Sequence, residues 1–541
     1  EDRRTYKDKL IESVKMKFGV MDRIDKKSDY YVYFYFHGLS LLNEKGTFCF
    51  ITSNSWLDVG FGKHLQEFLL KYVPIIAIYD NPKRSFEHAS INTIIAVFGA
   101  PRISEKTLSN FKAGSEECPA LKEVAKFVMF KRPFEEVLSA ENLIAIDKIE
   151  VKERNADLTE LVENVVDTAD YRVFPVLQED LLEDGWEYPA GYDRERGKFK
   201  AGSYGGNKWG GKFLRAPAIF YTILRKGKGK LVRLGDIAEV RRGFTTGANE
   251  FFYVEDVTDK NPDLSRVENI RNLQTIEEIR DASLRIIKPS KFKRGDKDYR
   301  LFLVEEEFLK AIIFSLKQLE KVNFYNKEVF NKLAIFCHLP RNELKNHFIL
   351  DYIEYGESQK YNKRPTCESR DNWYMLGKNW EPAELIFPSK IGERFLVYLN
   401  THGLFEDKKQ YGIFAKGIKK ESLLWFMNST LFRLYIELTS RQLTGAQAIA
   451  DIDVKVVKDA LILNIPFNKG EFILRPIRSI FEECGIDPSK PIREQEPNPL
   501  PDRAELDNII FDELGLTAAE RKEVYWSVCE LVKQRLEKAR S

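Results

Sequence analysis

GTFCFITSNSWLDVGFGKHLQEFLLKYVPIIAIYDNPKRSFEHASINTIIAVF, residues Gly46 to Phe98, carries the clearest secondary-structure pattern of the chain. Runs of β-branched and aromatic residues alternate in it with one segment of helical spacing. Thr47 to Thr52 predicts a strand buried on both faces, and Phe61 to Tyr72 predicts a helix that ends before Pro74. Two further buried strands are expected at Ile75 to Tyr79 and Asn92 to Phe98. The pattern indicates an α/β sheet.

This stretch resembles the second half of the catalytic domain of adenine-N6 DNA methyltransferases from restriction-modification systems, in particular the large fused type IIG-like enzymes and their phage-defence relatives. The resemblance rests on Leu39 to Leu70, which contains Ile-Thr-Ser-Asn-Ser-Trp-Leu, and on Phe86 to Thr93, Phe-Glu-His-Ala-Ser-Ile-Asn-Thr. It implies a partial Rossmann-like methyltransferase sheet over residues 1–110. It also implies S-adenosylmethionine as the methyl donor.

Two motifs of that family are not visible in the sequence. Family members bind S-adenosylmethionine with a Gly-rich strand-to-helix turn and grip the target adenine with an Asn/Asp-Pro-Pro-Tyr/Phe loop. The nearest candidate, Asn81-Pro82-Lys83-Arg84, lacks the second proline and the aromatic residue. We therefore expect the C-terminal part of a larger enzyme, or one half of a split one, with the cofactor bound mainly by the missing part. Such a chain would bind DNA without methylating it.

The composition indicates folded domains in a reducing compartment. The 541 residues suffice for three or four domains of about 150 residues, and 43% of them are hydrophobic. No apolar run reaches the roughly 18 residues of a membrane span, and the first residues do not begin a signal peptide. The six cysteines have no zinc-type spacing. We expect a cytoplasmic protein with no metal site and no membrane partner.

The net charge does not by itself indicate a nucleic-acid binder. Lys and Arg total 85 against 83 for Asp and Glu, a formal charge of +2. The densest basic cluster runs from Arg215 to Arg242. It is either an ordinary solvated surface or part of a DNA-facing one.

Phe86 is the candidate catalytic-pocket residue of the opening stretch. It lies in a loop between two predicted strands, where the resemblance implies an aromatic side chain against the flipped adenine. An everted base loses its stacking, and an aromatic face restores part of it. The alternative is a loop phenylalanine folded onto the core. Upstream, Asp29 to Asn43 predicts a packing helix with Tyr31, Phe34 and Tyr35 on its buried face and Ser28 or Asp29 as its N-cap.

A second resemblance begins at Leu231. Leu231 to Phe252 looks like the opening of a target-recognition domain, as in type I specificity subunits and the C-terminal domains of adenine methyltransferases. Leu234 to Ile237 predicts a helical turn, and a strand follows near Val240. Between Gly243 and Gly247 a loop could place backbone amides and neighbouring arginines on phosphates, or it could be a simple glycine-rich turn.

The candidate DNA-contacting residues come from this region and from later phrases that resemble the same kind of domain. In the segment RPTCESRDNWY (residues 364–374), Arg364 or Arg370 could pair with a guanine edge or hold a phosphate. Further along the chain, Gln442 and Gln447 could pair with adenine or be ordinary loop residues. The full set is Arg241, Arg242, Thr245, Lys291, Arg364, Arg370, Lys390, Arg441, Gln442 and Gln447.

The remaining chain completes the expected organisation. Residues 111–215 predict a connecting, helical region that ends in a Gly-rich hinge at 203–211, and residues 216–486 predict an α+β target-recognition domain. Helical spacing predicts a packing helix from Leu309 to Leu319 and an amphipathic helix from Ser422 to Leu438, interrupted at Asn428-Ser429. Residues 487–541 predict a linker and a C-terminal helical hairpin, with Gly515 between the helices and Thr517 capping the second.

Three functions stay open from the sequence. The first is a site-specific, base-flipping adenine-N6 DNA methyltransferase of a restriction-modification or phage-defence system. Its partners would be double-stranded DNA and the upstream methyltransferase half or a partner subunit. The second is a non-catalytic DNA specificity module that serves a separate methyltransferase or endonuclease. An endonuclease is the third, but no Pro-Asp…Asp/Glu-x-Lys constellation supports it.

Overall fold

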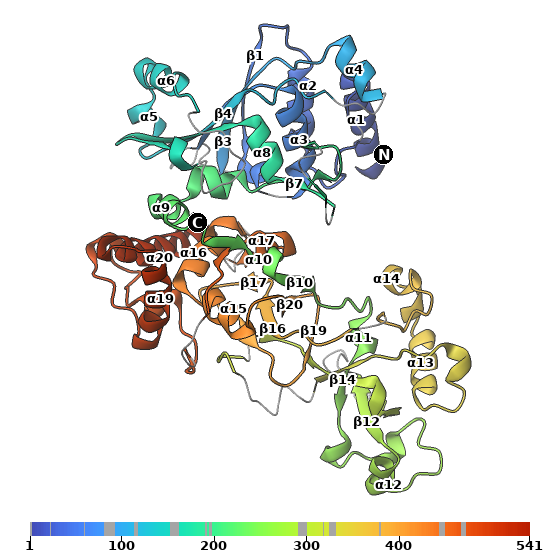
Figure 1. Cartoon of the computed structure of the whole chain (residues 1–541). Helices are drawn as coiled ribbons and strands as arrows, with labels where there is room; N and C mark the ends of the chain where they lie inside the picture. The colour runs from blue at the N-terminus through green and yellow to red at the C-terminus, as the bar shows by residue number, and fades with distance from the viewer. Residues whose placement is uncertain are drawn as a thin grey trace. The chain divides into compact units, whose positions relative to one another are not determined.

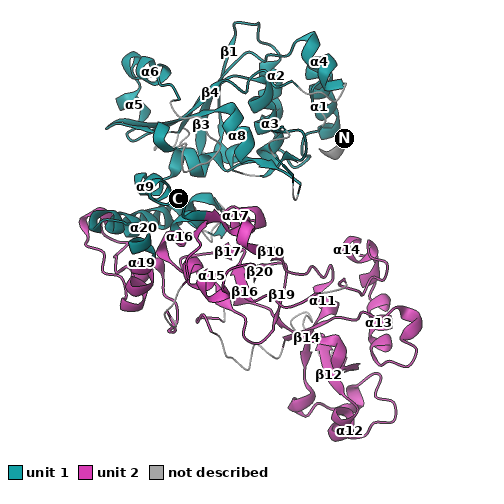
Figure 2. Cartoon of the chain, viewed as in Figure 1, with its two compact units in different colours: residues 1–231, 434–450, 510–541 teal, residues 232–433, 451–509 magenta. Residues whose placement is uncertain are grey.

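The computed structural model shows a mixed α/β chain with several sheets (Figure 1). The residues that it describes are 3–21, 23–58, 60–80, 92–112, 117–151, 162–189, 192–193, 197–289, 300–316, 319–323, 332–377, 380–442, 449–466 and 472–540. The chain divides into two compact units (Figure 2). Unit 1 comprises residues 1–231, 434–450 and 510–541, and unit 2 comprises residues 232–433 and 451–509. Each unit is therefore assembled from segments that are distant in the sequence.

Unit 1 is built on a six-stranded sheet of order β1-β3-β2-β4-β6-β5. The pair β2 and β4 is parallel, and the other neighbouring pairs are antiparallel. The strands are β1 (Thr47–Ser53), β2 (Ile75–Asp80), β3 (Thr93–Gly99), β4 (Val124–Phe130), β5 (Val166–Asp167) and β6 (Tyr171–Leu177). Three of them, β4 to β6, come from the region that we expected to be connecting and helical, so the sheet extends further along the chain than the sequence predicted.

The three strands predicted in the opening stretch are confirmed, but the prediction that the first is buried on both faces is wrong. β1 lies at the edge of the described sheet, and its residues alternate between exposed and partly buried up to Ile51, which is 37% exposed. Tyr35 packs on the other face, with its ring centre 6.0 Å from that of Phe48 and 5.2 Å from that of Phe50. A short apolar run does not reveal whether its strand lies inside a sheet or at its edge.

Helix α2 (Tyr30–Leu39) confirms the predicted helix and one of its two candidate caps. The side chain of Asp29 accepts a hydrogen bond from the Tyr30 amide. Phe34, expected on the buried face, is instead 59% exposed, whereas Tyr33 is buried. Because nearly every position of this helix is apolar, the spacing of apolar residues cannot select its buried face.

The other helices of unit 1 include α3 (Lys63–Tyr72), which begins two residues later than predicted and ends before Pro74 as expected. Leu65, Phe68 and Tyr72 are buried, as the spacing predicted. The remaining helices described here are α1 (Arg3–Phe18), α4 (Glu105–Lys112), α5 (Phe134–Val137), α6 (Ala140–Asp147), α8 (Gln178–Asp184), α9 (Ala218–Lys226) and α20 (Ala518–Arg540).

The Gly-rich run at 203–211, which we expected to act as a hinge, lies within unit 1 and takes part in its core. Trp209 is fully buried, and its ring centre lies 5.8 Å from that of Trp56, which is also fully buried. A π-helical segment, Gly210–Arg215, follows. Asp58 binds this π-helical segment. Its carboxylate pairs with Arg215 at 2.6 Å and accepts from the Gly211 amide at 3.2 Å.

Gln66 ties this run to the turn after β1. Its side-chain amide is buried and donates to the carbonyl oxygens of Trp56, Leu57 and Asn207 at 3.0, 3.1 and 3.2 Å. Its carbonyl oxygen accepts from the Tyr204 hydroxyl at 2.9 Å and from the Asn207 amide at 3.1 Å. A single buried amide therefore satisfies groups of two distant segments.

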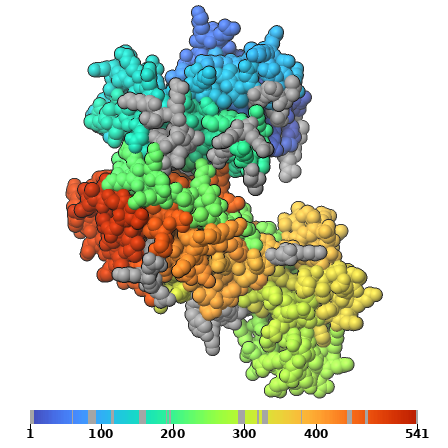
Figure 3. Space-filling view, in the orientation of Figure 1, coloured from blue at the N-terminus to red at the C-terminus, as the bar shows by residue number. Residues whose placement is uncertain are grey.

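Unit 2 contains two larger sheets. The four-stranded sheet, of order β10-β20-β16-β18, is antiparallel throughout, and the six-stranded sheet, of order β13-β12-β11-β15-β14-β19, is antiparallel except for its last pair. The strands are β10 (Ala238–Arg242), β20 (Gln410–Ala415), β16 (Leu385–Pro388), β18 (Tyr398–Leu399), β13 (Phe302–Glu305), β12 (Leu284–Pro289), β11 (Tyr253–Asp256), β15 (Lys332–Ile335), β14 (Leu309–Ile313) and β19 (Phe405–Glu406). Figure 3 shows the yellow-green segments around the second sheet gathered as one lobe of this unit.

The helix predicted from Leu309 to Leu319 is wrong, because the segment begins with strand β14. Leu309 and Ile312 also fit a helical spacing, but Ile312 and Ile313 are β-branched and pack well on a pleated sheet. The helical turn predicted at Leu234 to Ile237 is confirmed as α10 (Leu234–Ile237), and the strand that follows it is β10.

The later helices follow the sequence closely. The interruption predicted at Asn428-Ser429 separates α15 (Lys420–Met427) from α16 (Thr430–Thr439). Two more helices are α13 (Ile349–Ser358) and α19 (Pro501–Glu513). Gly515, with φ +63°, lies between α19 and α20, and the Thr517 hydroxyl caps α20 by accepting from the Glu520 amide at 3.3 Å. No helix among the described residues combines the length and apolar composition needed to cross a bilayer.

Candidate nucleic-acid interface

The two arginines at the end of β10 have different surroundings. Arg241 is partly buried and donates to the Glu381 carbonyl at 2.6 Å, and its guanidinium lies 3.7 Å from the Glu406 carboxylate. Its guanidinium carbon is also 5.1 Å from the centre of the Trp380 ring. Arg242 is exposed, and within the described ranges its guanidinium contacts Tyr411, donating to the hydroxyl at 3.5 Å. Of the two, Arg242 is the one that is open to a ligand.

The loop after β10 packs closely against helix α14 (Pro365–Glu368), which lies in the segment RPTCESRDNWY, residues 364–374. Gly247 has φ +79°, and a Cβ atom there would lie 2.8 Å from Thr366 Cβ and 3.1 Å from Cys367 Sγ. The Cys367 thiol donates to the Thr246 carbonyl at 3.6 Å. Glycine is therefore required at this position both for its backbone conformation and for the close approach.

Arg370, further along the same segment, also binds the loop after β10. Its Nη2 donates to the Thr245 carbonyl at 2.6 Å and its Nη1 to the Trp373 carbonyl at 3.1 Å. The Thr245 side chain is exposed. Burial lowers the pKa of Arg370, but an arginine stays charged throughout the physiological range. The guanidinium is thus a clamp that presents Thr245 to solvent.

Arg364 fixes the start of α14. Its Nη1 pairs with the Glu250 carboxylate at 2.7 Å, and its guanidinium carbon lies 4.8 Å from the centre of the Tyr361 ring. Cys367, Trp373 and Tyr374 are buried. The loop after β10 and the segment 364–374 are more than a hundred residues apart in the sequence, but they pack together in unit 2.

Two acidic residues beneath β10 were missed by the sequence analysis. Glu406 and Asp407 are each 1% exposed, and burial raises the pKa of both carboxyl groups. Tyr253 donates its hydroxyl to Asp407 at 3.2 Å, while the backbone amide of Ala383 donates to Glu406 at 3.4 Å. An acidic pair followed by two lysines looks like a solvated turn in the sequence, so no local signal marks these carboxyl groups as buried.

The other predicted contacts are distributed over both units. Lys390 is exposed on β17 (Lys390–Ile391) of unit 2, and Arg441 is exposed on β21 (Arg441–Gln442) of unit 1. The side chain of Gln442 lies outside the described residues, as do Phe86, Lys291 and Gln447 entirely. Their predicted roles stay predictions.

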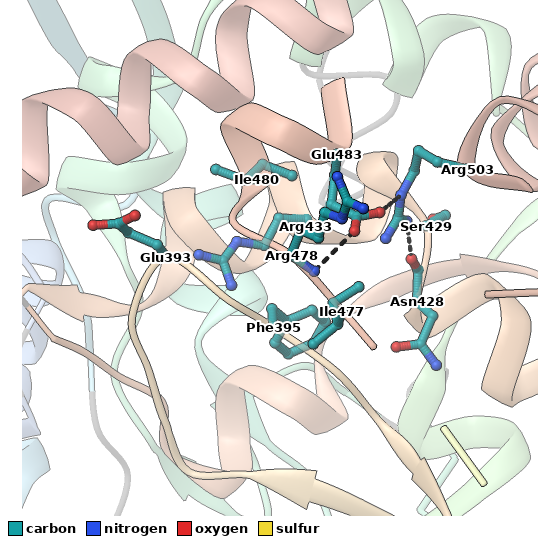
Figure 4. Close-up of a pocket in the computed structure, with 10 residues that line it drawn as sticks. All are labelled: Glu393, Phe395, Asn428, Ser429, Arg433, Ile477, Arg478, Ile480, Glu483 and Arg503. Carbon is teal, nitrogen blue, oxygen red and sulfur yellow. Dashed lines mark hydrogen bonds and ion pairs between the residues drawn. The ribbon is translucent and has the colours of Figure 1, made fainter. Parts of the chain in front are cut away.

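A basic cluster around Glu483 of α18 (Ile480–Cys484) surrounds a cavity of only about 10 Å³, which is room for about one water molecule (Figure 4). Glu483 accepts from Arg503 at 3.2 Å and from both Nη atoms of Arg475 at 2.7 and 2.9 Å. The cluster therefore joins α18 to α19 and leaves no space for a larger ligand. Within the described ranges, no three His, Cys, Asp or Glu side chains gather as a metal site.

Comparison with known proteins gives two family matches. Residues 5–86 match the Eco57I restriction-modification methylase family, and residues 296–446 match the C-terminal domain of the type II methyltransferase M.Eco57I. Both are families of restriction-modification methyltransferases. The second matched region of this chain contains Arg364, Arg370, Lys390 and Arg441.

Individual proteins match this chain over short stretches or at low identity. Type II methyltransferase M.AccI of Acinetobacter calcoaceticus is 33% identical over 103 residues, which are 18% of this chain and 18% of the relative. Among solved structures, the type IIG restriction endonuclease BpuSI has a TM-score of 0.34 at 12% identity, over 99% of this chain and 52% of that one. The type IIL restriction-modification enzyme MmeI, solved in complex with DNA, has a TM-score of 0.37 at 9% identity, over 83% and 44%. The aligned part is about half of each of these two enzymes and less than a fifth of M.AccI.

Proposed function

We propose that this chain supplies DNA target recognition to a site-specific adenine-N6 methyltransferase of a restriction-modification or phage-defence system. In this proposal residues 216–486 are the target-recognition domain. The main support is the Arg370 side chain, which joins the segment 364–374 to the loop after β10. It thereby fixes the exposed Thr245 in the loop that follows the exposed Arg242. A hydroxyl, loop amides and an exposed guanidinium are groups that proteins use on phosphates and base edges. The family matches support the same class of enzyme.

The structure refines the roles proposed for the predicted residues. Arg242 and Thr245 are the proposed direct contacts, because their side chains are exposed. Arg370 and Arg364 act as positioning residues, because protein carbonyls and Glu250 already engage their guanidinium groups. Arg241 is proposed to support Arg242 through its buried neighbours rather than to reach the DNA.

S-adenosylmethionine is the methyl donor that we propose for the whole enzyme, but the described residues do not fit it by themselves. The strand-to-helix turn after β1 is the natural place for such a ligand in an α/β sheet. There the Trp56 side chain is fully buried, and a Cβ atom at Gly62 would lie 2.0 Å from the Trp56 carbonyl oxygen. The close approach leaves no Gly-rich cradle, so we assign no step of the reaction to this turn. Phe86 remains the proposed contact to the everted adenine.

A second candidate function is a DNA specificity module without catalysis of its own. The filled turn after β1 favours it, since a partner chain would then supply both cofactor and chemistry. The two candidates share the recognition role of unit 2 and differ in whether joining to an upstream methyltransferase half restores methyl transfer.

The recognition role is tested by equilibrium binding of the 541-residue chain to a panel of duplexes between 50 and 200 mM salt. Arg242→Ala should weaken binding across sequences and lower the slope of log affinity against log salt by about 1. Arg280→Ala is the matched control, because Arg280 lies on α12 (Ile276–Asp281) in an exposed ion pair with Asp259. Failure of the chain to bind any duplex would refute both candidates. If the chain joined to a methyltransferase half that carries the two missing motifs failed to transfer a labelled methyl group, only the first candidate would be refuted.

A further inference from the structure

Unit 2 contains a cavity of about 400 Å³ that the recognition role does not use. It lies between the six-stranded sheet and the segment that follows Trp373, and its walls include Phe336, Trp380, Phe405 and Leu376. The volume falls in the range of cavities that hold small organic ligands, roughly 300–1,000 Å³. It is also far larger than the water-sized cavity near Glu483.

The aromatic walls are fixed by packing behind them. The ring centre of Phe336 lies 5.0 Å from that of Phe244 and 5.1 Å from that of Phe405. Trp380 lies 6.1 Å from Phe244 and donates its indole N–H to the Leu376 carbonyl at 2.9 Å. With the indole nitrogen already satisfied, the rings offer their faces and edges to a ligand. Such surfaces favour a flat, aromatic guest.

The polar groups of the cavity are Lys310 and His338, and no carboxylate lines it among the described residues. Lys310 is partly buried on β14, and its ammonium group makes no hydrogen bond or ion pair within the part of the chain that the structure describes. A partly buried ammonium beside aromatic rings suits a ligand with an anionic group next to a flat ring.

The wall of the cavity packs against residues at the base of the proposed recognition loop. Phe244, which supports both Phe336 and Trp380, is the residue directly before Thr245. Arg241 lies over Trp380, and Arg242 follows it in β10. Each proposed DNA contact is therefore the chain neighbour of a residue that packs on the cavity wall.

We propose that this cavity accepts an unstacked nucleobase of the bound DNA, with the base on Trp380 and Phe336 and the adjacent phosphate on Lys310. The inference rests on the proposed recognition function and adds a second base-binding site to it, separate from the one proposed for Phe86. Stacking on aromatic side chains offsets part of the cost of removing a base from the duplex. The occupant is a base that is attached to its strand, because the charge and the neighbouring loop both point to the phosphodiester backbone.

The test uses the full chain and two 30-base-pair duplexes of one sequence, one fully paired and one with a single unpaired 2-aminopurine. Wild type should bind the second duplex at least tenfold more tightly, which is about 1.4 kcal/mol, and should quench its fluorescence. Trp380→Leu should abolish the quenching and the preference, and Trp380→Phe should retain most of the preference. Lys310→Ala should lower affinity for the unpaired duplex severalfold. Lys345→Ala, an exposed lysine of the same unit away from the cavity wall, should behave as wild type.

The outcomes separate this inference from the recognition function. Equal affinity of wild type for both duplexes, with the paired duplex still bound, overturns the inference alone. Unchanged quenching in Trp380→Leu, with a native circular dichroism spectrum, overturns it as well. Quenching that free deoxyadenosine monophosphate competes away as effectively as the unpaired duplex would assign the cavity to a free nucleotide and overturn the proposed occupant. If wild type bound neither duplex, the recognition function itself would fail.

Discussion

Replacing Arg370 by alanine should loosen the recognition loop without removing a DNA contact. The side chain makes two hydrogen bonds to backbone carbonyls, at 2.6 Å to Thr245 and 3.1 Å to Trp373. Hydrogen bonds from a charged donor contribute about 1.5–3 kcal/mol each. Since Arg370 is only partly buried, we take the lower end for one bond and less for the other. The expected loss of unfolding free energy is about 2 kcal/mol.

The assay combines urea unfolding with DNA binding at several salt concentrations. Arg370→Ala should lower the unfolding free energy of unit 2 by that amount and weaken DNA binding, while the salt slope stays that of wild type. Arg370→Lys keeps the charge but cannot bond to both carbonyls at once, so it should recover at most half of the stability. Arg280→Ala, with its side-chain partner Asp259 79% exposed, should cost at most about 1 kcal/mol.

One combination of results would refute the positioning role of Arg370. If the alanine variant unfolded as wild type and its salt slope fell by about 1, the guanidinium would be a phosphate contact instead. The clamp described here would then form only in the absence of DNA.

Three further predictions concern stability. Gln66→Leu should destabilise unit 1 by about 3 kcal/mol in urea unfolding, because it leaves three buried carbonyls without their donor. Arg535→Met should cost about 3–5 kcal/mol, because it leaves the fully buried Glu437 carboxylate without the guanidinium that binds it at 3.0 Å through two nitrogens. The raised pKa values of Glu406 and Asp407 make their contribution complete below the unfolded values of about 4, and it is lost as the pH rises through the folded values. The urea midpoint of wild type should therefore fall relative to that of Glu406→Gln as the pH rises from about 4 to 7.5.

Each of these stability predictions has its own control. Gln66→Glu retains the acceptor oxygen but no donor, so it should be at least as unstable as the leucine variant. The double variant of Arg535→Met with Glu437→Leu should recover most of the loss, since a well-packed apolar pair can replace a buried ion pair. A double variant as unstable as Arg535→Met alone would show that packing, not charge, explains the effect. For the carboxyl pair, a wild-type urea midpoint that rose relative to that of Glu406→Gln over this pH range would contradict the sign of the argument.

The sequence was most informative where local signals agreed. Capping and spacing identified α2 and α3, and the polar Asn428-Ser429 pair marked the break between α15 and α16. The same signals failed where burial depends on distant partners. Phe34 lies on a helix that is apolar on all sides, and β1 is exposed because of its place in the sheet.

The candidate site shows the same division. The two segments that carry Thr245 and Arg370 could be identified in the sequence. The contact between them could not be predicted, because it brings Gly247 against Cys367, which is 120 positions away in the sequence. The cavity beside Trp380 depends on rings from three separate segments and left no local pattern. Buried Glu406 and Asp407 look like surface residues in the sequence because acidic side chains usually are.

The chain leaves unit 1 after residue 231, returns at 434, leaves again after 450 and returns at 510. A premature stop codon before residue 518 would therefore remove α20, with Arg535, from unit 1. Under the proposed function, an exchange of target specificity would have to move residues 232–433 together with residues 451–509, because both segments belong to unit 2. The order in which the chain contributes segments to its two units thus limits which fragments can be exchanged between such proteins.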